Sequence, residues 1–238
     1  MKDYKITFTG RKKICENTFS FYFSTGDSGY SYKPGQYAHF TLTGAKYNDI
    51  KGNSRPFSFA GSPHIKDKLI IAARVNSSVF VRNLCELNVG SEVFVSKPGG
   101  NLFKPDDTIL PVVFIAGGTG ITPVRSIIEF LIHKKSGRKI FLFYSNKSRN
   151  RTAFYDDFKN WSEANENFIF IPSVDSKETQ NPGFEQGYIN SAMLRKYLKE
   201  LNGNHYILTG PDEMTDSIRN ILLSENVVIS DIRTDKLN

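Results

Sequence analysis

The hydrophobic pattern changes character about halfway along the chain. In the first half, apolar and polar residues alternate over short runs at 18–23, 36–42 and 92–95, while 69–75 is more continuously apolar. Turns rich in Gly and Pro separate these runs, and only 79–87 has helical spacing. Many short alternating runs between such turns are typical of a small antiparallel barrel.

The second half predicts parallel strands joined by helices. The expected elements are strands at 112–116, 140–144, 168–174 and 205–209 and helices near 123–135, 152–164, 190–201 and 211–223. This alternation predicts a doubly wound parallel sheet, which binds ligands at the carboxyl ends of its strands. We therefore expect two domains, residues 1–105 and 106–238, with a ligand cleft between them.

The most informative local pattern lies at 112–123. An apolar strand ends in Gly117-Gly118-Thr119-Gly120, and a helix is expected with Thr122 as N-cap, Pro123 as first residue and Gly137 as C-cap. A strand, a glycine turn and a helix N-terminus form an anion site, because free N–H groups and the positive end of the helix dipole face the ligand. A tight turn without a ligand is the alternative for this stretch alone.

Composition limits the classes of function. The chain has 238 residues, of which 39% are hydrophobic and 23% charged, as in ordinary globular proteins. It has no N-terminal apolar signal and no run long enough to span a membrane, so we expect a cytoplasmic protein. Two cysteines are too few for a disulfide framework or an iron–sulfur cluster, and the four histidines are scattered, so no metal site is predicted.

The net charge of +7 belongs almost entirely to the first half of the chain. Residues 1–110 hold 15 Lys and Arg against 9 Asp and Glu, whereas 111–238 hold 16 against 15. The charge either steers an acidic partner or is only a solvated surface, and the sequence favours neither. The high pI of about 9.3 alone suggests nucleic acid, but no RNA- or DNA-binding motif accompanies it.

One strand of the barrel half carries three groups that suit a flat, phosphorylated ligand. Arg55, Phe57 and Ser58 follow one another there. A guanidinium can hold a phosphate with two hydrogen bonds, an aromatic ring can stack on a planar ring, and a hydroxyl can bond a ring nitrogen. An exposed Arg beside a core Phe is the alternative, and the residues alone favour it.

Motifs along nearly the whole chain resemble the ferredoxin–NADP reductase-like flavoprotein superfamily. In order, they lie at 55–58, 78–84, 98–100, 117–123, 144–146, 187–189 and 209–214. The resemblance implies a two-domain β plus α/β fold. An N-terminal six-stranded antiparallel barrel would bind a flavin, and a C-terminal doubly wound parallel sheet would bind a pyridine nucleotide.

The resemblance also implies roles for single residues. Arg55 and Ser78 would hold the flavin phosphates, Phe57 would stack on the isoalloxazine, and Ser58 would bond near N5. The implied cofactor-binding residues are Arg55, Pro56, Phe57, Ser58, Ala73, Arg74, Val75, Ser78, Gly117, Gly118, Thr119, Gly120, Thr122, Pro123, Gly210, Pro211 and Met214. Ser58 and Thr209 are the implied catalytic residues. FAD is favoured over FMN because Ser78 offers a second phosphate contact.

By the same resemblance, NADH or NADPH would give a hydride to FAD, and electrons would then reach a separate acidic protein such as ferredoxin or flavodoxin. A reductase of free flavin or quinone, and an electron-transfer subunit of a larger complex, are the alternatives. The chain has Thr209 where the family often has Cys, and its last residues, 233–238, include no aromatic residue, although Leu237 could cover the flavin.

The preference between NADH and NADPH stays open. Lys147, Arg149 and Arg151 follow the second strand of the predicted sheet and suit a 2′-phosphate, but they equally suit a solvated basic loop. Asp175, after the third strand, suits either rejection of that phosphate or a hydrogen bond to a ribose hydroxyl.

Overall fold

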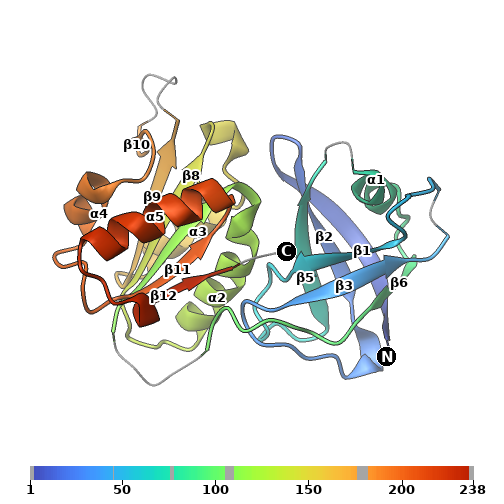
Figure 1. The fold of residues 1–238 in the computed structure, drawn as a ribbon. Helices are drawn as coiled ribbons and strands as arrows, with labels where there is room; N and C mark the ends of the chain where they lie inside the picture. The colour runs from blue at the N-terminus through green and yellow to red at the C-terminus, as the bar shows by residue number, and fades with distance from the viewer. Residues whose placement is uncertain (1–2, 45, 76–77, 105–109, 176–181, 236–238) are drawn as a thin grey trace. The chain divides into compact units, whose positions relative to one another are not determined.

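The computed structural model describes residues 3–44, 46–75, 78–104, 110–175 and 182–235 (Figure 1). The chain forms two compact units, one of Met1–Lys104 with Thr122–His133 and one of Pro105–Ile121 with Lys134–Asn238. Each unit has its own six-stranded sheet and its own hydrophobic core. The predicted domain boundary at 105/106 lies outside the described residues, so that division stays a prediction.

Unit 1 is built on the predicted antiparallel barrel. Its sheet has the strand order β4-β3-β6-β1-β2-β5. The elements are β1 Tyr4–Cys15, β2 Thr18–Ser24, β3 Tyr37–Leu42, β4 Ser54–Ser58, β5 Lys68–Arg74, helix α1 Val79–Cys85 and β6 Glu92–Val95. The sequence did not predict β1, because three successive charged residues, 11–13, interrupt its alternation.

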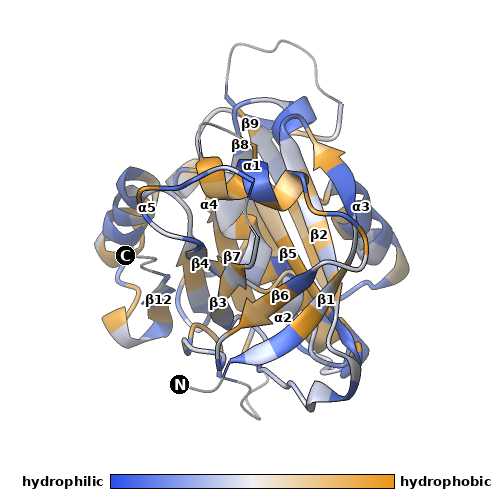
Figure 2. Cartoon of the chain, turned by 90° about the vertical axis from the view of Figure 1, so that its right-hand side faces the viewer, coloured by the Kyte–Doolittle hydropathy of each residue, from blue (hydrophilic) through white to orange (hydrophobic). Residues whose placement is uncertain are grey.

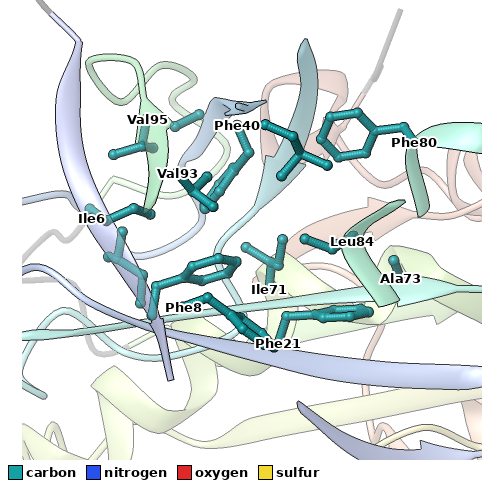
Figure 3. Close-up of a cluster of buried hydrophobic side chains, with 14 of the residues drawn as sticks. Ile6, Phe8, Phe21, Phe40, Ile71, Ala73, Phe80, Leu84, Val93 and Val95 are labelled. Atoms are coloured by element: carbon teal, nitrogen blue, oxygen red, sulfur yellow. The ribbon is translucent and has the colours of Figure 1, made fainter. Parts of the chain in front are cut away.

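Alternation along the strands builds the core of unit 1. In β3, Ala38, Phe40 and Leu42 are buried, while the residues between them are at least partly exposed. Figure 2 shows hydrophobic and hydrophilic residues along the same strands, as expected when one side of a strand faces the core and the other faces water. Helix α1 contributes Phe80 and Leu84 to the same cluster (Figure 3).

Unit 2 is the predicted parallel sheet, with the strand order β10-β9-β8-β7-β11-β12. Its strands are β7 Val112–Gly117, β8 Ile140–Asn146, β9 Phe168–Val174, β10 Glu185–Gln186, β11 His205–Thr209 and β12 Ile232–Thr234. Its helices include α3 Tyr155–Ala164, α4 Ser191–Tyr197 and α5 Asp212–Ser224 (Figure 1). The edge strands β10 and β12 were not predicted, because two or three residues are too few to show alternation.

Helices cover both faces of this sheet, as expected for a doubly wound fold. Val113, Phe143 and Leu208 lie in one core cluster with Met193 of α4 and Ile218 of α5. Tyr144 points to the opposite face, where its ring meets the edge of Phe158 from α3 at 6.3 Å between ring centroids. The carboxyl ends of β7, β8, β9 and β11 therefore form one edge of a sheet that is covered on both sides.

Helix α2, Ile121–His133, starts earlier than the sequence predicts. A 3-10 turn, Gly118–Gly120, leads into it, and the N–H of Ile121 bonds back to the carbonyls of Gly118 and Thr119. Thr122 is therefore not the N-cap, and Pro123 is the third helical residue, where a backbone N–H still has no partner within the helix. Gly137 is not the C-cap, because the helix ends at His133 and Lys135 already has a φ of 49°.

Residues 122–133 of α2 belong to unit 1 and make polar contacts within it. Arg125 donates through Nη1 to the carbonyl of Ala60 at 2.7 Å, and Ser126 donates to that of Gly61 at 2.6 Å. The N–H of Ser62 donates to Glu129 Oε2 at 2.8 Å. These contacts fix the turn that directly follows β4. Across the described residues, no helix is long and apolar enough to cross a membrane.

Candidate cofactor sites

Most of the predicted flavin residues of unit 1, at 55–58 and 73–74, lie on β4 and β5, the two edge strands of the barrel sheet. Strands β4 and β5 approach each other at one end, where Phe59 pairs with Ile71 and the N–H of Ala60 donates to the carbonyl of Ile70 at 2.7 Å. Along the described parts of the two strands, no further ladder pair continues this register toward Phe57 and Ala73. The barrel therefore has an unpaired seam, with 55–58 on one side and 73–75 on the other.

Arg55 is held closely by its own chain. Its Nη2 donates to Asp49 Oδ2 at 2.7 Å, and its Nη1 donates to the carbonyls of Lys51, Gly52 and Ser54 at 2.9, 3.1 and 2.6 Å. The side chains of Arg55 and Asp49 are only 21% and 11% exposed. The loop before β4 thus pre-orients the guanidinium and neutralises its charge at the same time.

Phe57 is half-buried rather than fully presented to solvent. Its ring centroid lies 5.7 Å from that of Phe80 on α1 and 6.0 Å from that of Phe40. Pro56 beside it is exposed, and Ser58 is buried. Ser58 has no side-chain hydrogen bond among the described residues, so its hydroxyl is available to a ligand. One side of the Phe57 ring supports the core, and the exposed remainder suits stacking.

The other flavin-side residues frame the same seam. Ala73 is buried, Arg74 is exposed, and the N–H of Val75 donates to the carbonyl of Asn17 at 2.7 Å. Ser78 is the N-cap of α1, and its hydroxyl accepts the N–H of Val81 at 3.5 Å. The structure therefore brings Arg55, Phe57 and the start of α1 together, with Phe80 of that helix in contact with both Phe57 and the Arg55 guanidinium.

In unit 2, glycines let two loops of the carboxyl edge touch backbone to backbone. A Cβ on Gly120 would lie 2.6 Å from the N of Gly210 and 2.8 Å from the carbonyl carbon of Thr209. A Cβ on Gly117 would lie 2.6 Å from Met214 Sδ. A side chain at Gly120 would meet backbone that cannot move aside, whereas one at Gly117 would meet the flexible end of Met214, so the start of the predicted segment 117–123 and the segment 209–214 form one compact cradle.

Three buried polar atoms at this edge have no partner in the described structure. They are Thr209 Oγ1 at the end of β11, Asn146 Nδ2 at the end of β8 and Ser173 Oγ near the end of β9. Strand alternation puts Thr209 and Asn146 on the face of Tyr144, and Ser173 on the other face. A buried polar atom without a partner costs free energy, so this edge fits a polar ligand with hydrogen-bonding groups.

The loops after β8 and β9 contain the residues considered for discrimination between NADH and NADPH. The Arg149 guanidinium lies 5.7 Å from the ring centroids of both Tyr155 and Phe184, which stack on each other at 5.2 Å. Asp175 Oδ2 lies 3.5 Å from the hydroxyl of Tyr188. Both a cation and a carboxylate are thus fixed near the edge, and the preference stays open.

Sequence reasoning missed three residues of these sites. Asp49 lies in a loop without periodicity, so nothing in the sequence marked it as the partner of Arg55. The motif at 144–146 assigns no role to Tyr144, although its hydroxyl bonds the glycine turn. Asp235 follows β12, its N–H donates to the carbonyl of Leu208 on β11 at 3.0 Å, and partial burial raises the pKa of its carboxyl, which nothing in the sequence indicates. Within the described ranges, no group of His, Cys, Asp and Glu is arranged to hold a metal.

A comparison with known proteins identifies a family model that matches much of the second half of the chain. Residues 114–220 match the family model of the oxidoreductase NAD-binding domain. The chain is 27% identical over 197 residues to one component of the Na(+)-translocating NADH-quinone reductase of Idiomarina loihiensis, covering 79% of this chain and 47% of that protein. It is 28% identical over 209 residues to DmpP, the reductase component of phenol 2-monooxygenase of Pseudomonas sp., covering 84% and 56%.

Solved structures share the fold over the whole chain. The cytochrome P450 reductase GcoB of Amycolatopsis aligns with a TM-score of 0.85 at 20% identity and covers 99% of this chain and 69% of that one. A ferredoxin NADP+ reductase from Neisseria gonorrhoeae, with bound FAD and NADP, aligns with a TM-score of 0.81 at 19% identity and covers 99% and 98%. The chain spans about half the length of the curated relatives it matches. The predicted two-part fold is confirmed, and the Neisseria protein was solved with FAD and NADP bound.

Proposed function

We propose that this chain, which has the fold of the ferredoxin–NADP reductase-like superfamily and an oxidoreductase NAD-binding domain, is a NAD(P)H-dependent FAD oxidoreductase that passes electrons to a separate acceptor. One observation carries most of the proposal. The carboxyl edge of unit 2 combines a cradle closed by glycines with a buried Thr209 hydroxyl that has no partner among the described residues, inside the matched domain. Such an edge is the ligand site of doubly wound sheets.

The carboxyl edge of the second sheet and the start of α2 would bind and orient the nucleotide. The turn 117–120 and the first turn of α2 offer backbone N–H groups to a diphosphate. Thr209 and the 210–214 loop would hold the nicotinamide end, and Asn146 would meet the other end of the dinucleotide. Because neighbouring strands in a sheet lie about 4.8 Å apart and only β7 lies between β8 and β11, Thr209 and Asn146 are two strand spacings, roughly 10 Å, apart across the sheet, a distance that a dinucleotide can span.

The residues of unit 1 would bind the flavin. Arg55 would pair with its pyrophosphate, Ser78 would add a second phosphate contact, and Phe57 would stack on the ring system. Ser58, buried and with a hydroxyl free to bond, would orient the ring near the position that accepts hydride. The flavin supplies the redox chemistry when bound, accepting a hydride and releasing electrons singly or in pairs. The chain supplies orientation and exclusion of water, so no strong acid or base is needed.

The acceptor is proposed to be a small acidic electron-transfer protein such as ferredoxin or flavodoxin. The excess of positive charge lies in residues 1–110, the part that would hold the flavin. A positive surface there would steer an acidic partner and raise the rate of encounter. Among the relatives, DmpP is named a reductase component, which supports transfer to a partner protein.

An alternative acceptor is a quinone or a free flavin, with the chain acting alone or within a larger complex. The similarity to a component of a Na(+)-translocating NADH-quinone reductase favours this alternative. The two proposals differ in the salt dependence that they predict. Docking of an acidic protein weakens steeply between low and physiological ionic strength, whereas reduction of a neutral small acceptor does not.

The test of the proposed function is spectroscopic. The purified protein, reconstituted with FAD, is expected to show a flavin absorption spectrum that NADH or NADPH bleaches under anaerobic conditions. Titration with each nucleotide separately then gives the preference that the sequence leaves open. A protein that retains no flavin after reconstitution, or a bound flavin that neither nucleotide reduces, would contradict the proposal.

A further inference from the structure

A buried tyrosine on β8 is hydrogen-bonded to the glycine turn of unit 2. Tyr144 is completely buried, and its hydroxyl donates to the carbonyl of Gly118 at 3.0 Å. The same carbonyl accepts the N–H of Ile121, which closes the 3-10 turn. Gly118 itself has a φ of 54°, a conformation that residues with a Cβ rarely adopt. The Gly118 carbonyl is thus fixed from two directions.

Fixing this carbonyl also fixes the next backbone N–H. In a planar trans peptide, the C=O of one residue and the N–H of the following residue point in opposite directions. The described residues contain no cis peptide bonds. Because the Gly118 carbonyl points toward Tyr144, the N–H of Thr119 points away from it. Backbone N–H groups of such turns are what phosphate oxygens bind at a helix N-terminus.

The tyrosine ring is enclosed by its neighbours in the sheet and by one helix. Strand β8 lies between β7 and β9, with Tyr144 opposite Ala116 on one side and Pro172 on the other. The ring also makes an edge contact with Phe158 of α3, at an interplanar angle of 76°. The phenol is therefore a buried support with a fixed place in the core of the sheet.

We propose that Tyr144 is a positioning residue of the dinucleotide site, which orients the peptide between Gly118 and Thr119 for the diphosphate without touching the ligand. The inference rests on the proposed function, because it assigns a role only if the turn 117–120 binds NADH or NADPH. It identifies a side chain beneath the turn as a determinant of nucleotide affinity.

The same sheet offers a matched control. Tyr206 on β11 is also completely buried, and its hydroxyl also donates to a backbone carbonyl, that of Leu201, at 2.7 Å. Tyr144→Phe and Tyr206→Phe therefore remove the same kind of hydrogen bond from the same sheet. Only Tyr144 is bonded to the glycine turn.

The experiment compares the two variants with the wild-type holoprotein, using ferricyanide as electron acceptor and NADH and NADPH as donors. Tyr144→Phe is expected to raise KM for the nucleotide and its Kd by about two- to tenfold, the range of one neutral hydrogen bond, with FAD affinity unchanged. Tyr206→Phe is expected to leave both constants unchanged. An unchanged KM and Kd in Tyr144→Phe, or an equal rise in both variants, would overturn the inference.

Hydrogen exchange of the wild type gives a second measurement that does not depend on a variant folding. Saturating nucleotide is expected to slow amide exchange in 117–121 beyond the slowing seen in 201–205. Unchanged exchange at 117–121, with nucleotide shown to be bound, would overturn the role of the turn and of Tyr144. A wild type that binds neither nucleotide would overturn the proposed function itself, and the two failures are therefore distinguishable.

Discussion

The two candidate cofactor sites differ in how many of their polar groups are already hydrogen-bonded to other groups of the chain. In unit 1, Arg55 is bonded to Asp49 and to three backbone carbonyls, so the chain itself occupies much of the hydrogen-bonding capacity of its main anion-binding group. In unit 2, Thr209, Asn146 and Ser173 each bury a polar atom that has no partner among the described residues. The main anion-binding group of the first site is hydrogen-bonded within the chain, whereas the second site has buried polar atoms without partners in the described structure.

This difference indicates two modes of binding. An unpartnered buried polar atom costs about 1–3 kcal/mol, and a ligand that bonds it recovers that free energy. The edge of unit 2 therefore keeps hydrogen-bonding capacity in reserve for a ligand. At Arg55, a phosphate would share the guanidinium with Asp49 or replace it, so flavin binding would include a local exchange of partners. Single substitutions can test both the rigidity of unit 2 and the exchange in unit 1.

The largest effect is expected from Gly120→Ala. The new Cβ would meet backbone atoms of Gly210 and Thr209 at 2.6 and 2.8 Å, and neither can rotate away as a side chain would. The two loops must separate, so we expect NAD(P)H affinity to fall more than tenfold and stability to fall by about 1–3 kcal/mol. Isothermal titration and urea unfolding measure the two effects.

Gly99→Ala is the matched control for Gly120→Ala. Its Cβ would lie 3.5 Å from the ring of Tyr37, an ordinary van der Waals distance, and Gly99 does not have a positive φ. We expect nucleotide affinity to stay unchanged in this variant. Wild-type nucleotide affinity in Gly120→Ala would show that the two loops of unit 2 can separate at little cost. The proposed difference between a rigid site in unit 2 and an adaptable site in unit 1 would then be wrong.

The next effect is expected from Arg55→Ala, which should weaken FAD binding by about 10- to 100-fold. Charge-assisted hydrogen bonds to phosphate are each worth about 1.5–3 kcal/mol. Asp49→Asn keeps the shape of the partner but removes its negative charge, so it is expected to strengthen FAD binding. Fluorescence titration of the apoprotein with FAD measures both. Unchanged affinity in Arg55→Ala would rule out the phosphate role, and weaker binding in Asp49→Asn would show that Asp49 supports the site rather than competing in it.

The sequence predicted the framework of both sites better than their internal bonding. Strands β9 and β11 have the predicted ends because their apolar runs are bounded by polar residues. The start of α2 was misplaced, because the N-cap preference of Thr122 and the N1 preference of Pro123 could not reveal that Gly118–Gly120 forms a 3-10 turn. The Asp49–Arg55 pair depends on a loop conformation that no periodic pattern specifies.

The unpartnered polar atoms of unit 2 were beyond sequence reasoning for a related reason. A Thr or Asn at the end of a strand is visible in the sequence, but whether its polar atom finds a partner depends on the whole neighbourhood. Thr209 was expected near the nicotinamide only from the family resemblance. The unsatisfied state of its hydroxyl is a property of the packed edge, where Gly120 and Gly210 bring two loops into contact.

A smaller effect is expected from Thr209→Val, which replaces the hydroxyl by a methyl group of similar size. Removing a buried unpartnered hydroxyl should leave the free protein equally stable or more stable, while kcat/KM for NAD(P)H falls by about tenfold through the loss of one ligand hydrogen bond. The control is Thr215→Val, whose buried hydroxyl already donates to the carbonyl of Asp212 at 3.1 Å. This control should lose stability but keep its kcat/KM. A loss of stability in Thr209→Val would mean that its hydroxyl has a partner in solution.

The smallest effect concerns Asp235, which contrasts with Asp49 because no cation pairs with it among the described residues. Burial raises the pKa of the Asp235 carboxyl above its usual value of 3.8, so the folded state holds the proton more tightly than the unfolded state. Its contribution to stability is therefore complete below the unfolded pKa and is lost as pH rises through the folded pKa. At pH 7 the partly buried carboxylate weakens the fold, and Asp235→Asn should raise the melting temperature. The difference from wild type should shrink as pH falls toward 4.

Asp216→Asn, at an exposed position on α5, controls for the change in net charge. A melting-temperature difference that stays constant with pH would show that the carboxyl of Asp235 finds water or a cation in solution.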